Sequence, residues 1–225
     1  MKILVRLFAF AFLLMLSSCI EIIDDISFNE DGSGTFKYNI NLSSSKIKIN
    51  SILALDSLYG GEIPSVDELS KKIRASTESF KKNAGISAVS VESNFADFIF
   101  KIQCDFSSLE GLQHAIRTLI REETKNPLIP ELKHDWLSYS ESRFMRSVPL
   151  ITSKKLSDIT FEDRELLKQG TYTSITRFYT RIESFSNPNG KLSKKQEALM
   201  TRSNIHALIQ NPNLLDNSIN LVNSN

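Results

Sequence analysis

Three acidic residues near the start of the chain are the first candidates for chemistry. Glu21, Asp24 and Asp25 lie in an alternating apolar segment, and the alternation places Asp24 on the same strand face as Ile22 and Ile26. A carboxyl buried on such a face can have a raised pKa and act as a general acid. Adjacent strand residues point to opposite faces, so Asp24 and Asp25 cannot cooperate. We therefore expect solvated acids at a strand edge, or an aspartate satisfied by neighbouring backbone.

The spacings of the histidines, serines and glycines do not indicate a known metal-binding, catalytic or phosphate-binding motif. The three histidines, His114, His134 and His206, are far apart in the sequence and do not form a metal-ligand motif. No Gly-x-Ser-x-Gly segment marks a nucleophile. The segment 32–34, Gly-Ser-Gly, precedes a strand rather than a helix, which is typical of a turn and not of a phosphate-binding loop. The sequence thus predicts no catalytic residue, no cofactor and no metal site.

Basic and aromatic residues are interleaved in two later segments. If the two segments form neighbouring strands, they give one basic and aromatic face that could bind anionic headgroups or glycans. An exposed amphipathic strand face is the simpler interpretation and the one we expect. The residues concerned are Arg143, Arg146, Lys154 and Lys155 around Phe144, Met145 and Val148, and Arg177 and Arg181 on either side of Tyr179.

Two cysteines occur, in very different settings. Lys2 and Arg6 precede ten apolar residues, 7–16, and two serines then lead to Cys19. Ten helical residues cover roughly half of the ~30 Å hydrocarbon core, so this run suits a signal peptide better than a membrane span. Cys104 lies in an alternating apolar segment, and we expect a small buried side chain there rather than a nucleophile.

The segment 16–19, Leu-Ser-Ser-Cys, resembles the lipobox of bacterial lipoproteins. This resemblance implies that residues 1–18 are a signal peptide that is cleaved, and that Cys19 is lipidated and becomes the first residue of the mature protein. Ile20 and Glu21 follow, rather than the aspartate that retains such proteins at the inner membrane. The resemblance therefore implies a lipid-anchored protein of the bacterial cell envelope, at the outer membrane and facing the periplasm.

Two turns extend the resemblance beyond the lipobox. The turn over 30–34, Glu-Asp-Gly-Ser-Gly, and the later turn over 186–189, Ser-Asn-Pro-Asn, look like those of small uncharacterised lipoproteins of Bacteroidota. That family implies a location and an α+β fold, and it implies no activity.

The pattern of residues 19–225 predicts a single α+β domain, with a lobe boundary near 126–134. Alternation predicts hairpins over 20–28 with 35–42 and over 86–95 with 96–106. Helical patterns occupy 43–58 and follow capping boxes at 65–68 and 107–110. In the first of these helices, Ile49, Ile52 and Leu53 are expected to face inward, with Ile47 as a further candidate. The order predicts an antiparallel sheet of hairpins with helices packed on one face, as repeated ββα-like units.

Beyond the lobe boundary the pattern predicts strands over 135–148 and 171–185, with a short helix from 160 to 170 between them. A turn follows at 187–190. Residues 193–209 leave two alternatives, one long helix or a strand over 199–202 with a short helix over 205–209. The second alternative suits Thr201, Ser203 and Asn204 better. A last strand is expected over 219–222.

Composition narrows the functional classes. The 225 residues include 27 basic and 26 acidic ones, and no basic block gives the concentrated positive face that nucleic acid requires. The lack of a catalytic constellation favours a non-enzymatic, lipid-anchored envelope protein that docks a partner. The alternative is a carrier that holds a lipid or another apolar ligand between sheet and helices, motivated by the 14 phenylalanines. A hydrolase with dispersed carboxylates is a third hypothesis.

Overall fold

The computed structural model describes residues 20–55, 57–58, 61–124, 130–140, 142–148 and 167–222. The expected signal peptide, Cys19, residues 126–129 of the expected lobe boundary and residues 160–166 of the expected short helix lie outside these ranges. Among the helices of the described part, none has the length and hydropathy needed to cross a bilayer.

The first predicted hairpin is confirmed. Strands β1 (Glu21–Phe28) and β2 (Gly34–Asn41) pair in antiparallel fashion. Their turn is closed by a hydrogen bond from the backbone N–H of Asn29 to the carbonyl of Ser33, and Gly32 has a φ of 80°. Gly34 packs so tightly that a Cβ atom there would lie 2.0 Å from the carbonyl oxygen of Ser27. The Asp-Gly turn and the alternation of apolar residues therefore set both the position and the register of this hairpin.

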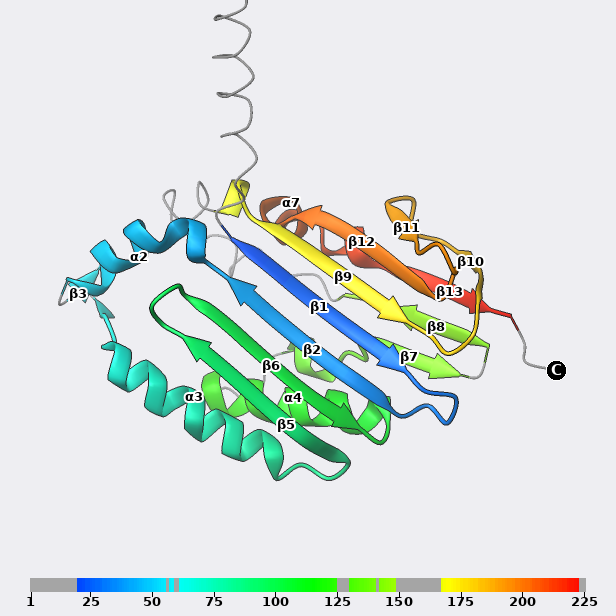
Figure 1. Cartoon of the computed structure of the whole chain (residues 1–225), viewed down its shortest axis with the longest axis horizontal. Coiled ribbons are helices and arrows are strands. Elements are labelled where there is room, and N and C mark those ends of the chain that lie inside the picture. Colours follow the sequence, from blue (N-terminus) through cyan, green and yellow to red (C-terminus); the bar gives the residue numbers. More distant parts are fainter. Residues whose placement is uncertain are drawn as a thin grey trace, which may run out of the picture.

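Two ββα-like units share one sheet, as the sequence predicts. Strands β5 (Ile86–Asn94) and β6 (Ile99–Phe106) form the second hairpin, and β6 pairs with β2. Helices α3 (Val66–Lys81) and α4 (Leu109–Thr124) cover one face of these strands (Figure 1). The capping box of Ser65 and Glu68 starts α3. At α4 the capping side chain is Ser108, one residue later than the 107–110 pattern indicates, and it accepts from the N–H of Gly111.

The large sheet has seven strands in the order β11-β12-β9-β1-β2-β6-β5. It takes strands from both sides of the expected lobe boundary, because β1 pairs directly with β9 (Thr171–Arg177). The α+β fold class is confirmed, with one correction to the expected antiparallel sheet: β1 and β9 are parallel, and their long connection runs through a second sheet. The edge is completed by β11 (Gly190–Leu192) and β12 (Ala198–Asn204).

The second sheet has four strands, β10-β13-β8-β7, and lies on the same side of the large sheet as α3 and α4 (Figure 1). It corrects two expectations. The single strand expected over 135–148 is a hairpin of β7 (Leu137–Ser140) and β8 (Arg143–Arg146). The strand expected over 171–185 divides into β9 and β10 (Ile182–Phe185), which belong to different sheets. The last strand is β13 (Asn217–Leu221).

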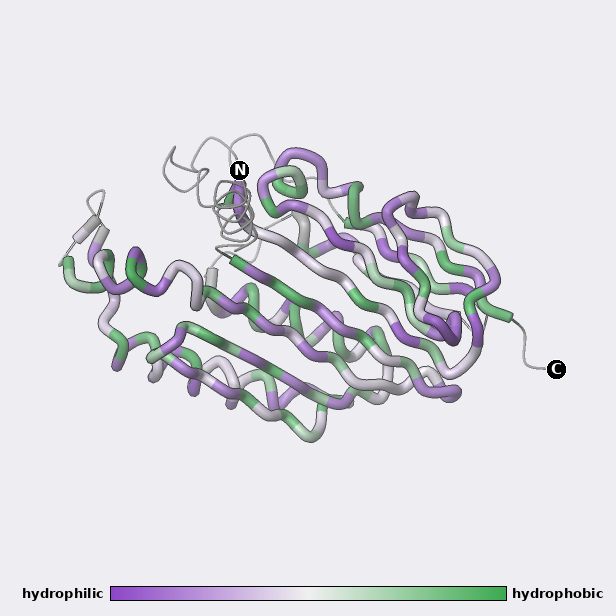
Figure 2. The backbone as a smooth tube through the Cα atoms, turned by 45° about the horizontal axis from the view of Figure 1, so that its top comes forward, coloured by the Kyte–Doolittle hydropathy of each residue, from purple (hydrophilic) through white to green (hydrophobic). Residues whose placement is uncertain are grey.

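One core fills the space between the layers. The ring of Phe28 contacts those of Phe106, Tyr139, Phe144 and Phe178, which come from the large sheet, the small sheet and the connection between β9 and β10. Phe178 follows directly after β9 and is buried in this core, and the chain turns there and passes to the other sheet. Figure 2 shows hydrophilic and hydrophobic residues alternating along the strands, as expected for sheets with one buried face.

Two helical segments lie outside the two ββα-like units. The segment over 43–58 differs from the expectation, and the segment over 193–209 agrees with the favoured alternative. Residues 43–58 form a short 3-10 turn, η2 (Ser43–Ser45), the eight-residue helix α2 (Lys46–Leu53) and then β3 (Ser57–Leu58), which pairs with β4 (Gly61–Glu62). Ile47 is 85% exposed and does not face inward. Residues 193–209 follow the second alternative, since β12 leads into α7 (Ile205–Gln210). Two further 3-10 turns are η3 (Pro130–Lys133) and η4 (Pro212–Leu215).

Candidate functional site

The most elaborate polar arrangement in the described part surrounds Asp24. This carboxylate is 4% exposed and lies between the two sheets. The guanidinium of Arg146 on β8 donates to both of its oxygens, at 2.9 and 3.1 Å. Two neighbours on β9 complete its shell, because the hydroxyl of Tyr172 donates at 2.5 Å and that of Ser174 at 2.8 Å. Four hydrogen bonds from three side chains therefore occupy the carboxylate.

This arrangement corrects the expectation for Asp24. The aspartate is neither solvated nor satisfied by backbone, and its donors stand 122 to 150 residues away in the sequence. Its carboxylate faces a permanently charged arginine, and both of its oxygens already accept hydrogen bonds from other side chains. Neither oxygen is therefore placed to exchange a proton with a substrate. The geometry is that of an ion pair that fastens the small sheet to the large one, rather than that of a general acid.

The two tyrosines beside the ion pair are held in their neutral form. Burial, and then the negative charge of Asp24, raise the pKa of Tyr172 well above its ordinary value. The same two causes raise the pKa of Tyr38, which lies opposite Asp24 on β2, to about 12. For Arg146, burial alone would lower the pKa, but the adjacent Asp24 and Tyr172 hold it above the ordinary value. Tyr38, Tyr172 and Arg146 thus each keep one protonation state over the physiological range.

A small polar cavity adjoins the ion pair. Its volume is about 10 Å³, which is room for roughly one water molecule. Arg146, Ser174, Thr176, Thr201 and Asn217 contribute polar side chains to its wall. A space of this size between the sheets does not accommodate an organic substrate.

Two larger hollows, of about 450 and 490 Å³, lie open at the surface where β1 meets β2. Their walls mix polar side chains, such as those of Thr35, Asp105 and Arg117, with apolar ones, such as those of Phe106 and Leu109. Neither is the enclosed apolar cavity that the carrier hypothesis requires. Between α4 and the large sheet the space is occupied by side chains such as those of Phe106 and Leu112, which are 2% and 0% exposed.

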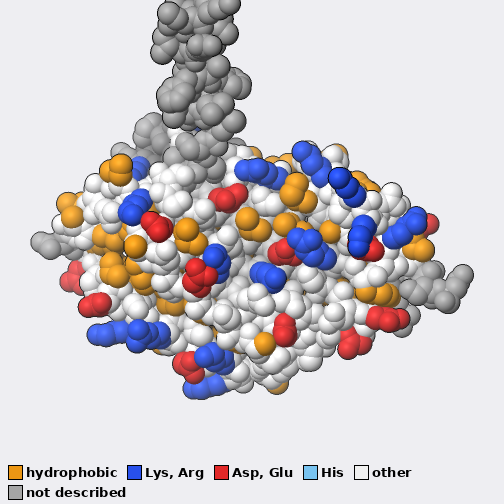
Figure 3. All heavy atoms as spheres, viewed as in Figure 1, with side chains coloured by type: hydrophobic (Ala, Val, Ile, Leu, Met, Phe, Trp, Pro, Cys, Tyr) orange, Lys and Arg blue, Asp and Glu red, His pale blue; other side chains and the backbone are white. Residues whose placement is uncertain are grey.

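The opposite face of the large sheet is open. Both sheet-covering helices and the small sheet lie on the inner side, so the outward side chains of β1, β2, β9 and β12 reach the surface (Figures 1 and 3). Asp25 is one of them, and it receives three hydrogen bonds of 2.9 to 3.1 Å from the guanidinium of Arg177. Asp24 and Asp25 therefore do point to opposite faces, as the sequence predicts.

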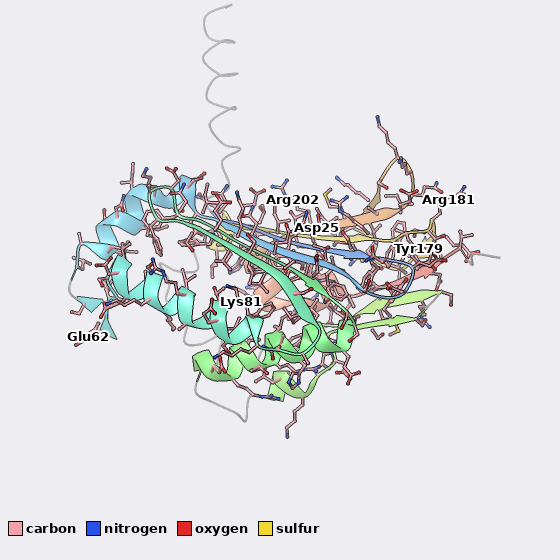
Figure 4. All side chains as sticks on the ribbon, turned by 60° about the horizontal axis from the view of Figure 1, so that its bottom comes forward. Asp25, Glu62, Lys81, Tyr179, Arg181 and Arg202 are labelled. Carbon is pink, nitrogen blue, oxygen red and sulfur yellow. The ribbon has the colours of Figure 1, made fainter. Side chains whose placement is uncertain are left out.

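Basic residues gather along one edge of this open face, formed by β9, β12 and β11. Figure 3 shows Lys and Arg side chains over the β9, β11 and β12 half of the sheet, and Figure 4 shows Arg202 and Asp25 projecting from the same side. We name this group the basic patch. Within the described residues, Arg177 is its one member with an ion pair, and all six are exposed. The members are Arg177, Arg181, Lys191, Lys194, Lys195 and Arg202.

The basic patch differs from the basic and aromatic face that the sequence raised. Strands β8 and β9 lie in different sheets, so their arginines do not share a surface. Arg146 is buried on Asp24, and Arg143 donates to the hydroxyl of Ser218. Arg177 and Arg181 do lie at the end of β9, but their basic neighbours come from the β11–β12 hairpin. The sequence indicates that hairpin by the turn at 187–190 and the strand over 199–202, but it does not indicate that the hairpin lies beside Arg177.

The remaining candidates lie apart from one another. The ring of His134 makes a 3.0 Å hydrogen bond with the carbonyl of Ser147. Cys104 is 0% exposed, and burial with the nearby Asp105 raises the pKa of its thiol to about 11. No group of three or more His, Cys, Asp or Glu side chains in the described part could hold a metal ion.

Cys19 lies outside the described residues, but the structure describes its neighbour in the sequence, Ile20. The carbonyl of Ile20 accepts a 2.8 Å hydrogen bond from the N–H of Thr171, at the start of β9. One residue therefore separates the expected lipidation site from β1, which begins at Glu21.

No match was found among protein-family models or among curated protein sequences. Among solved structures, the chain is similar to the folded domain of Mycobacterium tuberculosis LppM, determined by NMR. The two share 10% sequence identity and a TM-score of 0.41 over 92% of this chain and 91% of that one. At these values the likeness gives no information on function.

Proposed function

We propose that this protein is a lipid-anchored, non-enzymatic protein of the bacterial cell envelope, and that it docks an acidic protein partner through the basic patch. The observation that carries the docking role is the open face of the large sheet, where six exposed basic side chains gather along one edge. Within the described part only Arg177 has an ion pair there. Basic side chains that have no acidic partner in the described part favour a partner of opposite charge.

The anchor and the three lysines of the basic patch stand at different places on the fold. Lipidation at Cys19 would attach the bilayer at the start of β1. Lys191, Lys194 and Lys195 belong to the β11–β12 hairpin, and Lys191 pairs with Met200 beyond the far half of β9. A partner on this hairpin would therefore approach from the aqueous side while the protein stays on its membrane. The outer membrane, facing the periplasm, is the location that we propose for it.

The absence of an enzymatic role is part of the proposal. Its support is the state of Asp24, the best acidic candidate, whose two oxygens are occupied by Arg146, Tyr172 and Ser174. The carrier alternative has no comparable support in the described part, because its two large hollows are open to the surface and have mixed polar and apolar walls.

The anchor is tested by expressing the full chain in bacteria that are fed a radiolabelled fatty acid. The wild-type chain should incorporate the label and sediment with membranes, and the variant Cys19→Ala should do neither. Unlabelled wild-type protein in the soluble fraction would reject the anchor.

The docking role is tested by charge reversal. The double variant Lys191→Glu/Arg202→Glu should lose its partner in affinity purification from gently solubilised membranes, and wild-type binding should weaken with added salt. A matched control is Arg74→Glu/Lys82→Glu, which reverses two exposed charges on and beside α3. Equal partner recovery from all three proteins would reject the patch as the docking surface.

A further inference from the structure

The short helix α2 is unusual among the helices of this fold because none of its residues is buried. Four of its eight residues are apolar, and Ile47 is 85% exposed. Leu55, just after the helix, is 48% exposed. Ile47 lies in the first turn of α2 and Leu55 lies two residues beyond its end, so one short segment carries both exposed apolar side chains. Lys48, the residue after Ile47, adds an exposed basic side chain to the same segment.

The position of α2 in the fold is fixed by its neighbours. It follows directly after β2, whose last residue, Asn41, pairs with Glu21 at the start of β1. The ammonium of Lys46 forms a 3.1 Å ion pair with Asp97 in the turn between β5 and β6. Figures 1 and 2 both place α2 at the end of the sheet where β1 begins.

The same end of the sheet carries the expected lipid. Only Ile20 separates Cys19 from β1, and consecutive Cα atoms are about 3.8 Å apart, so an acylated Cys19 holds this end at the headgroups of the bilayer. There is no linker that would let the domain move away. Exposed apolar and basic side chains beside such an anchor match the chemistry of an interfacial lipid surface.

We propose that α2 lies on the membrane surface, with Ile47 and Leu55 in the interfacial layer of the bilayer and Lys48 near anionic headgroups. This inference rests on the proposed lipid anchor at Cys19. The anchor and α2 then make two contacts with the same membrane, which fixes the orientation of the large sheet relative to the bilayer. The turn between β1 and β2 is directed away from the membrane, about 25 Å further out, given eight residues of β1 at ~3.3 Å each.

The test places a fluorophore on the lipidated full-length protein after reconstitution into vesicles of phosphatidylethanolamine and phosphatidylglycerol. The label is attached at Ile47→Cys in one preparation and at Glu30→Cys, in the β1–β2 turn, in the other. Both sites are exposed, while Cys104 is buried and the thiol of Cys19 is blocked by the lipid. A nitroxide on the lipid chains near the headgroups serves as the quencher.

Position 47 should lose its emission when the nitroxide lipid is included, and position 30 should keep it. Equal emission from both positions, quenched or not, would overturn the inference. A second pair of proteins carries the label at Ser51→Cys with and without Ile47→Asp/Leu55→Asp, and the acidic substitutions should restore its emission. An unchanged emission in that pair would also count against α2 as the contact.

The same preparations separate the two proposals. Mass spectrometry and flotation show whether the protein carries acyl chains and stays with the vesicles. A protein without acyl chains that does not float would reject the anchor itself. An acylated protein that floats while position 47 stays unquenched would reject the role of α2 alone.

Discussion

Replacing Arg146 by methionine removes the charge that compensates Asp24 while keeping a long apolar side chain in its place. The side chains of Asp24 and Arg146 are 6% and 10% exposed, so the remaining carboxylate would have little access to water. Breaking a buried ion pair on one side costs about 3 to 5 kcal/mol. That is a large share of the ~5–15 kcal/mol by which a domain is usually stable, so Arg146→Met should unfold at much lower urea.

The assay is urea unfolding of the mature domain, followed by the fluorescence of Trp136. Arg143→Met is the matched control, because Arg143 lies on the same strand but is exposed, and among the described residues it donates only to the hydroxyl of Ser218. It should change the free energy of unfolding by less than about 1 kcal/mol. The double variant Asp24→Leu/Arg146→Met removes both charges and should recover much of the loss. If Arg146→Met and Arg143→Met are equally stable, Asp24 does not depend on Arg146 and the account of the two sheets is wrong.

Three further predictions concern stability and reactivity. Burial and Asp24 raise the pKa of Tyr38 from 10 to about 12, so its contribution to stability is complete below pH 10 and is lost as the pH rises towards 12. Urea unfolding should show this loss of stability between pH 10 and 12, and the loss should be smaller in Tyr38→Phe. The Cys104 thiol, with no exposure and a pKa of about 11, should react with a thiol reagent only as fast as the protein unfolds, and rapid labelling of native protein would contradict its burial. Gly34→Ala should lower the unfolding free energy by more than about 2 kcal/mol, since the new Cβ would lie 2.0 Å from the carbonyl oxygen of Ser27. An unchanged urea midpoint would show that β1 and β2 can separate at no cost.

Features that depend on neighbouring residues could be predicted from the sequence. The Asp-Gly turn between β1 and β2 and the capping box of Ser65 and Glu68 each act over three or four residues, and both are present. Alternation also placed Asp24 and Asp25 on opposite faces, because the period of a strand leaves no other arrangement.

Features that depend on distant residues could not be predicted. Nothing local indicates that β9 pairs in parallel with β1, 150 residues earlier, or that Arg146 reaches Asp24 from another sheet. The division of 171–185 at Phe178 has the same cause, since an aromatic residue in an alternating run looks the same whether it continues a strand or turns into the core between two sheets.

The candidate surfaces follow the same division. Cys19 can be singled out because charge, apolar run and cysteine all lie within nineteen residues. The basic patch joins Arg177 and Arg181 to side chains of the β11–β12 hairpin, and only the order of strands brings them together. The exposure of Ile47 could not be predicted from the sequence either, since an isoleucine in a helical pattern usually faces the core.

The central claim, that the protein docks a partner through the basic patch, is tested most directly by photo-crosslinking in intact cells. A photoreactive amino acid replaces Leu192, which lies between Lys191 and Lys194, or Met145, which lies on the small sheet. These side chains are 39% and 40% exposed, so they are equally available to a neighbour. We predict a crosslinked partner from position 192 that is absent from position 145 and disappears when Lys191 and Arg202 are changed to glutamate. The same products from both positions, or crosslinks only between copies of this chain, would contradict the claim.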